Sequence, residues 1–244
     1  MSLKLISGKG GVGKTYVTAL LYRQKTSARL FDCHGDLQEQ MEELHLPIPK
    51  IELRNDSQLI RSTLIKIVII DKIAAWAADH RFIQNLFRLA PNLLEFLFLL
   101  QMIELAESDE SDLIVDAPST GNFLGLLKSV QSAKRMFDAG LMKKNSGRIF
   151  DFLNNPDKTE FVLVALPERS ALDEMLELEK EIKDLFPRAK IIRVLNRKHE
   201  EEKNWKDLPP ELHFLAHDRV IKENERVKDL HFDFILKEAE VKLV

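Results

Sequence analysis

Short apolar runs alternate with segments of helical periodicity along most of the chain. The runs are continuous rather than alternating and end at a polar residue, a glycine or a proline, which is typical of strands buried on both faces. The segments between them place apolar side chains on one helical face. We therefore expect strands at residues 3–6, 28–31, 113–115, 161–166, 191–195 and 212–216, and helices at residues 16–23, 125–137 and 170–186.

This alternation predicts the fold class. Parallel strands need crossover connections, which are usually helices, so strand and helix in turn indicate an α/β fold. We expect a mostly parallel, doubly wound sheet with helices on both faces. The chain has 244 residues, which one such sheet can accommodate, so we expect a single domain over residues 1–244.

One region interrupts the alternation. From about residue 56 to residue 106 the chain is largely apolar or helix-favouring, with Pro91 as its one proline and no glycine. We expect a helical insertion there, although residues 64–70 suit a strand equally well. Residues 96–100 are apolar around the whole helical circumference, so this helix is either buried or an exposed surface for a partner. The acid-rich residues 104–112 then predict a solvated loop.

The stretch GKGGVGKT lies between the first expected strand and the first expected helix. Glycines let consecutive backbone N–H groups point at phosphate oxygens, and the helix N-terminus adds partial positive charge. In such a loop the final lysine neutralises the β- and γ-phosphates, while the adjacent hydroxyl binds Mg²⁺. We therefore expect a P-loop that binds ATP and Mg²⁺, with Lys14 as a catalytic cation and Thr15 as a metal ligand. The expected nucleotide-binding residues are Gly8, Lys9, Gly10, Gly11, Val12, Gly13, Lys14, Thr15 and Tyr16.

Lys9 is a second lysine inside the loop. With it, the stretch resembles the deviant Walker A motif of a P-loop ATPase superfamily that includes arsenite-pump, tail-anchored-protein-targeting, division-site-selection and plasmid-partition ATPases. The resemblance implies that Lys9 is catalytic and crosses a dimer interface to the phosphates bound by the other subunit. ATP would then close a homodimer. Tyr16 departs from the Thr or Ser that relatives commonly carry there.

Two aspartates directly follow expected strands. Asp32 follows residues 28–31 and Asp116 follows residues 113–115. Ligands of open parallel sheets bind beyond the carboxyl ends of the strands, so both carboxylates are placed to act on one. Phosphoryl transfer needs a group that orients the attacking water and a carboxylate in the Mg²⁺ shell. The two carboxylates match these two tasks. We expect both Asp32 and Asp116 to be metal ligands, with a turn or cap carboxylate as the alternative for Asp32.

The surroundings of these aspartates resemble a narrower branch of the superfamily. Residues 32–37 are similar to switch I, and residues 116–127 to switch II, of the arsenite-pump and tail-anchored-targeting ATPases, with Asn122 in place of the usual histidine. In that branch the first aspartate positions the hydrolytic water, so the resemblance implies that Asp32 is catalytic. The position matched by Asn196 contacts adenine in that branch. The cysteines that the branch uses for cargo or zinc are missing, because Cys33 is the one cysteine.

Composition limits the partners. A net charge of -3 provides no general attraction to nucleic acid, so none is expected as a partner. A single cysteine suits a reducing compartment, and no apolar run reaches the roughly 20 residues of a membrane span. The expected location is cytoplasmic, without an integral membrane segment.

These observations predict a Mg-ATP-hydrolysing homodimeric switch of the arsenite-pump or targeting type, acting on an unknown protein or hydrophobic-segment client. Two alternatives stay open. One is a positioning or partition ATPase on a membrane or nucleoid surface, which would need a basic tail that residues 229–244 do not provide. The other is a nucleotide-binding regulator with little turnover, for which Tyr16 and Asn122 leave room.

Overall fold

The computed structural model describes residues 2–55, 92–136, 140–166, 169–198 and 213–216, which form seven strands and six helices. The strands are β1 (Leu3–Gly8), β2 (Arg29–Asp32), β3 (Ile51–Leu53), β4 (Leu113–Asp116), β5 (Thr159–Ala165), β6 (Lys190–Lys198) and β7 (His213–Ala216). The helices are α1 (Lys14–Gln24), α2 (Leu37–Glu43), α5 (Leu93–Glu107), α6 (Thr120–Met136), α7 (Gly140–Leu153) and α8 (Arg169–Leu185).

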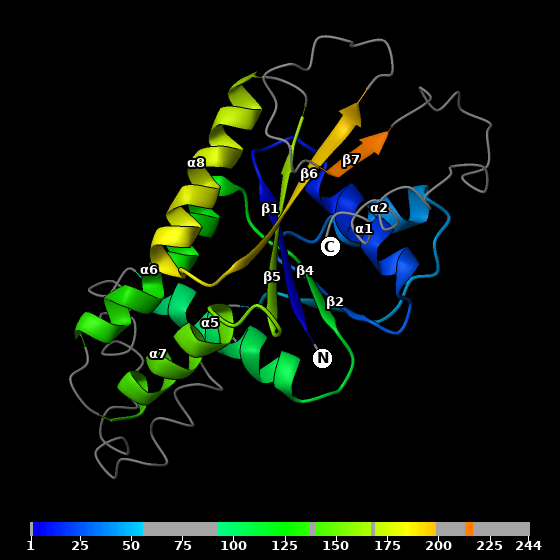
Figure 1. Ribbon diagram of the computed structural model, residues 1–244. Coiled ribbons are helices and arrows are strands. Elements are labelled where there is room, and N and C mark those ends of the chain that lie inside the picture. The colour runs from blue at the N-terminus through cyan, green and yellow to red at the C-terminus, as the bar shows by residue number, and fades with distance from the viewer. Residues whose placement is uncertain (1, 56–91, 137–139, 167–168, 199–212, 217–244) are drawn as a thin grey trace.

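The strands form one sheet in the order β3-β2-β4-β1-β5-β6-β7 (Figure 1), and every pairing is parallel. β1 lies in the middle, with Leu3 paired to Leu113 of β4 and Thr159 of β5. Asp32 and Asp116 lie opposite each other at the carboxyl ends of β2 and β4. The predicted α/β fold, with a doubly wound parallel sheet, is confirmed.

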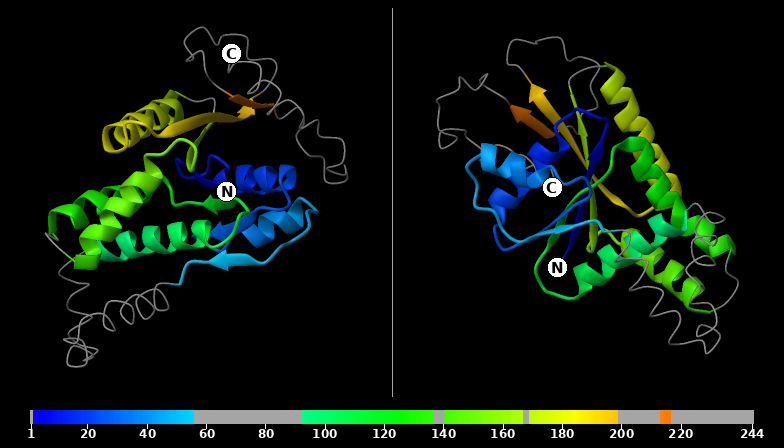
Figure 2. Two further views of the ribbon diagram at one scale, coloured as in Figure 1. Left: turned by 60° about the horizontal axis from the view of Figure 1, so that its bottom comes forward. Right: turned by 180° about the vertical axis from the view of Figure 1, so that it is seen from behind.

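Helices cover both faces of the sheet. α1 and α2 lie on one side, and α5, α6, α7 and α8 lie on the other (Figure 2). Parallel strands are joined by right-handed crossovers, so a change in the direction of travel along the sheet moves the helix to the opposite face. From β1 the chain travels towards β3, and after β3 it returns through β4 towards β7. The reversal makes the region beyond β1 and β4 the switch point, where open α/β sheets bind ligands.

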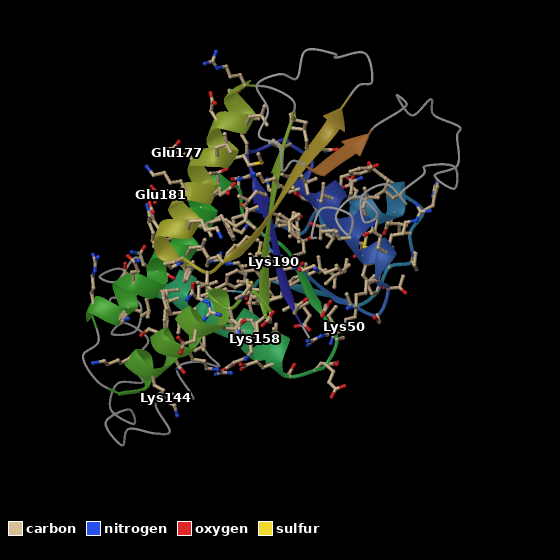
Figure 3. The ribbon with its side chains drawn as sticks, viewed as in Figure 1. Lys50, Lys144, Lys158, Glu177, Glu181 and Lys190 are labelled. Atoms are coloured by element: carbon tan, nitrogen blue, oxygen red, sulfur yellow. The ribbon has the colours of Figure 1, made fainter. Side chains whose placement is uncertain are left out.

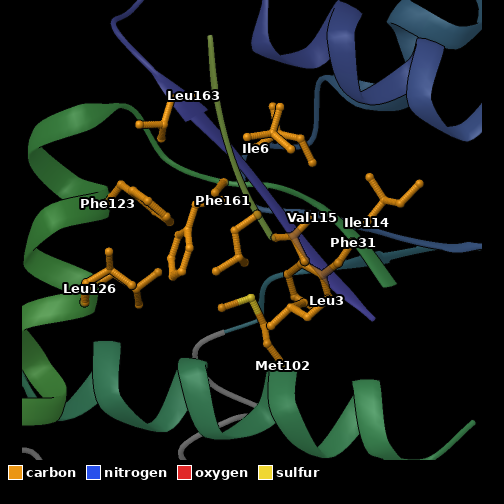
Figure 4. Packing of buried hydrophobic residues seen from close by; sticks show 14 of the residues in the cluster. Leu3, Ile6, Phe31, Met102, Ile114, Val115, Phe123, Leu126, Phe161 and Leu163 are labelled. Carbon is orange, nitrogen blue, oxygen red and sulfur yellow. The ribbon is translucent and has the colours of Figure 1, made fainter. Parts of the chain in front are cut away.

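The main core lies between the sheet and the helices of the α5 side. In Figure 4, Phe31, Val115 and Phe161 from the strands point towards Met102 of α5 and Phe123 of α6. All five side chains are fully buried, and the rings of Phe123 and Phe161 lie 6.3 Å apart between centroids. Burial of side chains this large is a major contribution to folding free energy, at about 25 cal/mol per Å² of apolar surface. The core therefore holds β1 and β4, and so the switch point, in place.

Helix α5 contains residues 96–100, which the sequence predicts to be either buried or exposed to a partner. All five are buried, and the Phe98 ring lies 5.4 Å from that of Phe31. The sheet covers one side of this helix, and α6 and α7 cover other sides. Apolar side chains around its whole circumference can therefore be buried. Of the two readings, burial is confirmed for this segment.

Several boundaries differ from the sequence-based expectations. The solvated loop expected at residues 104–112 is wrong in part, because α5 continues to Glu107 and Asp112 is buried. The Asp112 carboxylate accepts hydrogen bonds from the Ser2 backbone N–H and from Lys25 Nζ, at 2.7 and 2.6 Å. Elements β3, α2 and α7 were not expected. Residues 56–91 of the expected insertion, including residues 64–70, lie outside the described residues, and no described helix is both long and apolar enough to cross a membrane.

Candidate nucleotide site

The glycine loop joins the end of β1 to the start of α1, and its conformation requires glycine at several points. Gly11 and Gly13 have left-handed backbones, with φ of 79° and 87°. A Cβ atom on Gly8 would lie 2.1 Å from the carbonyl oxygen of Val164 on β5. Gly13 is the N-cap of α1 and offers no side chain to cap it, so the first N–H groups of the helix receive no side-chain bond from that position. The loop therefore presents backbone donors and the positive end of a helix dipole, as phosphate-binding loops do.

Lys14 is folded back over this loop. Its Nζ donates a hydrogen bond to the backbone carbonyl of Lys9, at 3.2 Å. Burial lowers the pKa of Lys14, while the carboxylates of Asp116 and Glu174 raise it. The nearby carboxylates favour the charged form of this partly buried lysine, so Lys14 places a cation at the glycine loop.

Asp116 is the most deeply placed acid of the site. It is fully buried, and its Oδ1 lies 3.4 Å from the Thr18 hydroxyl. The pKa of Asp116 is raised to about 6, first by burial and then by the charge of Asp32, against the lowering effects of the Thr15 hydroxyl and the Lys14 charge. Its Oδ2 is buried and accepts no hydrogen bond from any described residue. A buried carboxylate oxygen without a donor is an acceptor that a bound cation would satisfy.

The donor set beside the loop fits Mg²⁺ held together with a nucleotide. Mg²⁺ usually keeps several waters and takes one or two protein oxygens plus substrate phosphates. Thr15 and Asp116 provide such a small set. The described residues contain no group of three His, Cys, Asp or Glu side chains that could hold a metal ion.

Asp32 has a structural task that is visible in the geometry. It is buried, and its two carboxylate oxygens accept backbone N–H hydrogen bonds from His34 and Leu37, both at 2.8 Å. The carboxylate thus organises the turn that contains Gly35, whose φ is 95°, and the start of α2. These bonds are those expected of a turn carboxylate, the alternative role considered for Asp32. The expected roles of Asp32 in water positioning and metal binding stay predictions.

The segments that resemble the two switches lie side by side. The backbone N–H of Cys33 donates to the carbonyl of Asp116 at 3.2 Å, so the segments are directly bonded. His34 from one segment and Pro118 and Asn122 from the other line one cavity of about 730 Å³. A movement of either segment would therefore change the shape of this cavity.

Asn196 and Tyr16 take supporting positions. Asn196 is buried on β6, and its Nδ2 donates to the carbonyl of Val12 at 2.8 Å, so it holds the loop from the side of the sheet. Tyr16 is partly buried against the core, where burial raises the pKa of its hydroxyl and the charge of Arg23 lowers it. The expected contacts of both residues with a nucleotide stay predictions.

Three site residues had not been expected from the sequence. Ser7 donates through its hydroxyl to the Pro118 carbonyl at 2.7 Å, which ties β1 to the second switch-like segment. Thr18 also bonds the Lys14 carbonyl at 2.9 Å, and its spacing of four residues from Lys14 was a usable signal. Glu174 on α8 lies near both loop lysines, and no local pattern in the sequence marks it.

Comparison with known proteins supports the fold. No protein-family model and no curated protein matches this sequence. Among solved structures, a plasmid partition protein from Borrelia burgdorferi is similar, with a TM-score of 0.50 and 14% sequence identity over 99% of each chain. At this identity the likeness shows a shared fold over the length of both chains.

Proposed function

We propose that this protein is a Mg-ATP-binding ATPase that acts as a nucleotide-controlled homodimeric switch. The observation that carries the proposal is that the glycine loop, Lys14 and the Oδ2 of Asp116 meet at the switch point of the sheet, where no described residue donates a hydrogen bond to that Oδ2. A cradle of backbone donors, a cation and a buried acceptor together match the needs of a Mg²⁺-bound triphosphate.

Each residue has a defined task in this proposal. The loop backbone and Lys14 bind and neutralise the phosphates, while Thr15 and Asp116 hold Mg²⁺. When bound, Mg-ATP supplies the phosphoanhydride bond whose hydrolysis resets the switch. Asp32, fixed by its two backbone hydrogen bonds, orients the water that attacks the terminal phosphate.

The two switch-like segments then report the nucleotide state. They are bonded to each other through Cys33 and Asp116, and they line the same cavity. A ligand shifts a conformational equilibrium by its differential affinity for the two states, so contacts made by the terminal phosphate alone would favour one arrangement of both segments. In the dimer, Lys9 reaches the phosphates held by the other subunit.

For the partner we favour the partition type. The similar protein from Borrelia burgdorferi is a plasmid partition protein, and the match covers 99% of both chains. The net charge is -3, but four exposed cations lie where α6 ends and α7 begins, and a local cluster is what phosphate backbones recognise. These are Lys134, Arg135, Lys143 and Lys144.

A targeting-type switch is the second candidate, and the segment at residues 116–127 is the observation in its favour. It resembles switch II of the arsenite-pump and targeting branch. The fully buried residues of α5 offer no exposed apolar face there, so a client surface would have to come from another part of the molecule or from the dimer.

One experiment separates these readings. Molar mass by light scattering and retention on double-stranded DNA are measured with Mg-ATP, with Mg-ADP and without nucleotide. A dimer that forms with Mg-ATP and then binds DNA in a salt-sensitive manner supports the partition type. A dimer that forms with Mg-ATP but is not retained on DNA favours the targeting type. A chain that binds no Mg-ATP would refute the proposal.

A further inference from the structure

Glu174 places a carboxylate against the glycine loop from a distant part of the chain. It lies on α8, the helix that follows β5, and its Oε2 is 3.6 Å from Lys9 Nζ. The same carboxylate raises the pKa of Lys14, so its charge acts on both lysines of the loop. The Lys9 and Glu174 side chains are 42% and 34% exposed, which leaves the pair open to exchange with another charged group.

In this position the Glu174 carboxylate would compete with a bound triphosphate for the lysines of the loop. Two lysines that serve triphosphate oxygens are left with excess positive charge when no phosphate is present. A neighbouring carboxylate offers the same charge sign and the same acceptor atoms as a phosphate, although with less charge. A bound triphosphate would therefore both attract the lysines away from Glu174 and be repelled by it.

We infer that Glu174 is a positioning residue that holds Lys9 against its own subunit until nucleotide phosphates release it. The inference rests on the proposed function, because it concerns the availability of Lys9 for the other subunit of the dimer. A lysine whose ammonium lies 3.6 Å from a carboxylate on α8 of its own chain must give up that contact before it reaches across an interface. Glu174 therefore opposes dimer closure in the absence of nucleotide.

Two acidic neighbours of Glu174 on α8, Asp173 and Glu177, do not contact the glycine loop in the way that Glu174 does. Asp173 points to another partner, since it lies 3.9 Å from Arg169. Glu177, one turn further along, is exposed and stands on the outer side of the helix (Figure 3). Glu177 is thus a matched control, because its removal changes the net charge of α8 equally without touching the loop.

The test measures Mg-ATP affinity by calorimetry and dimer formation by light scattering in Glu174→Gln and Glu177→Gln. Half-exposed ion pairs contribute up to about 1 kcal/mol, so Glu174→Gln should tighten Mg-ATP binding by about fivefold and lower the ATP concentration for half-maximal dimerisation similarly. Glu177→Gln should match the wild type. Glu174→Asp, which keeps the charge but withdraws the carboxylate by one methylene group, should give a smaller gain.

A double-mutant cycle with Lys9→Ala decides whether Lys9 is the group that Glu174 restrains. The gain in dimerisation from Glu174→Gln should disappear in the Lys9→Ala background, because the lysine that pairs with Glu174 is then absent. Equal gains in both backgrounds, or a Glu174→Gln protein that behaves like Glu177→Gln, would overturn the inference. The wild-type titration alone tests the proposed function: a wild type that binds no Mg-ATP rejects that function and this inference with it.

Discussion

Gly13 and Asn196 show how one side chain fixes the loop conformation. Gly13 has φ of 87°, and a Cβ atom there would lie 2.3 Å from Asn196 Nδ2. Asn196 in turn bonds the Val12 carbonyl, so it cannot move aside without losing a buried hydrogen bond. By contrast, a Cβ atom on Gly10 would meet nothing within 4 Å.

Gly13→Ala should therefore destabilise the protein, whereas Gly10→Ala should not. The first combines a left-handed backbone with a steric clash and should cost about 2 kcal/mol or more in the free energy of unfolding. The second should lie within about 0.5 kcal/mol of the wild type. Urea denaturation of both variants without nucleotide checks this, and equal stabilities would contradict the account of the loop.

Asp32 forms a turn and, in the proposed function, orients the attacking water. Two measurements on one variant can distinguish these tasks. Asp32→Asn keeps the shape but replaces one acceptor oxygen by an amide that cannot accept from the His34 or Leu37 N–H group. We expect hydrolysis at least about tenfold slower, with Mg-ATP binding retained, because an amide cannot serve as a base for water. Single-turnover hydrolysis, compared with the melting temperature of the same variant, checks the expectation. An unchanged rate together with lower stability would leave Asp32 only its turn-forming task.

Some site residues can be predicted from a local sequence pattern, whereas others reach the site only through the fold. Lys14, Thr15 and Asp116 stand at positions that a local pattern defines: a glycine loop between strand and helix, and an acid at the end of a strand. Asn196 contacts the loop across 184 positions of sequence, and Glu174 lies on a helix that only the sheet order brings near. Such contacts depend on topology, which periodicity does not determine.

Glu160 joins three neighbouring strands near the edge of the sheet opposite to the glycine loop. It lies on β5 and bonds Lys4 on β1 and Lys190 on β6, the latter at 2.6 Å. Burial by itself would raise the pKa of Glu160, but the hydrogen bonds from Lys190 and Lys4 outweigh it, and the pKa lies below its ordinary value of 4.5. The ionised form is therefore the one that stabilises the fold.

Glu160→Gln should lower the free energy of unfolding at pH 7 by about 1–2 kcal/mol. A depressed carboxyl pKa contributes stability above the unfolded-state value and loses it as the pH falls through the folded-state value. The difference between wild type and variant should thus shrink as the pH is lowered below about 4.5. Denaturation series at several pH values provide the measurement, and a difference that is constant with pH would argue against the ion pairs.

Two of the three elements that the sequence did not predict, β3 and α7, have physical reasons for being missed. β3 has three residues and lies at the sheet edge, where Leu53 is 58% exposed, so it shows neither length nor a buried run. α7 packs on α5 and α6 rather than on the sheet, so its place depends on helices already assembled. The strands β1, β2, β4, β5 and β6 were predictable because burial on both faces produces continuous apolar runs.

The whole molecule places its chemistry at the point where the chain reverses direction across the sheet. β1 and β4 are neighbours there, and they deliver the glycine loop and Asp116 to the same edge. α8 approaches from the β5 side with Glu174, and the turn ordered by Asp32 approaches from the β2 side. Groups with positive and negative charge thus meet around the glycine loop, which is the physical basis of the proposed switch.

Calorimetric titration of Mg-ATP into the wild type, Lys14→Ala and Lys50→Ala tests the central claim most directly. Lys50 is an exposed lysine away from the loop (Figure 3) and controls for the loss of one positive charge. The account predicts saturable binding to the wild type and to Lys50→Ala. Lys14→Ala should bind at least about a hundredfold more weakly, because charge-assisted hydrogen bonds to phosphate are lost. Equal affinity in all three proteins would contradict the assignment of the loop as the nucleotide site.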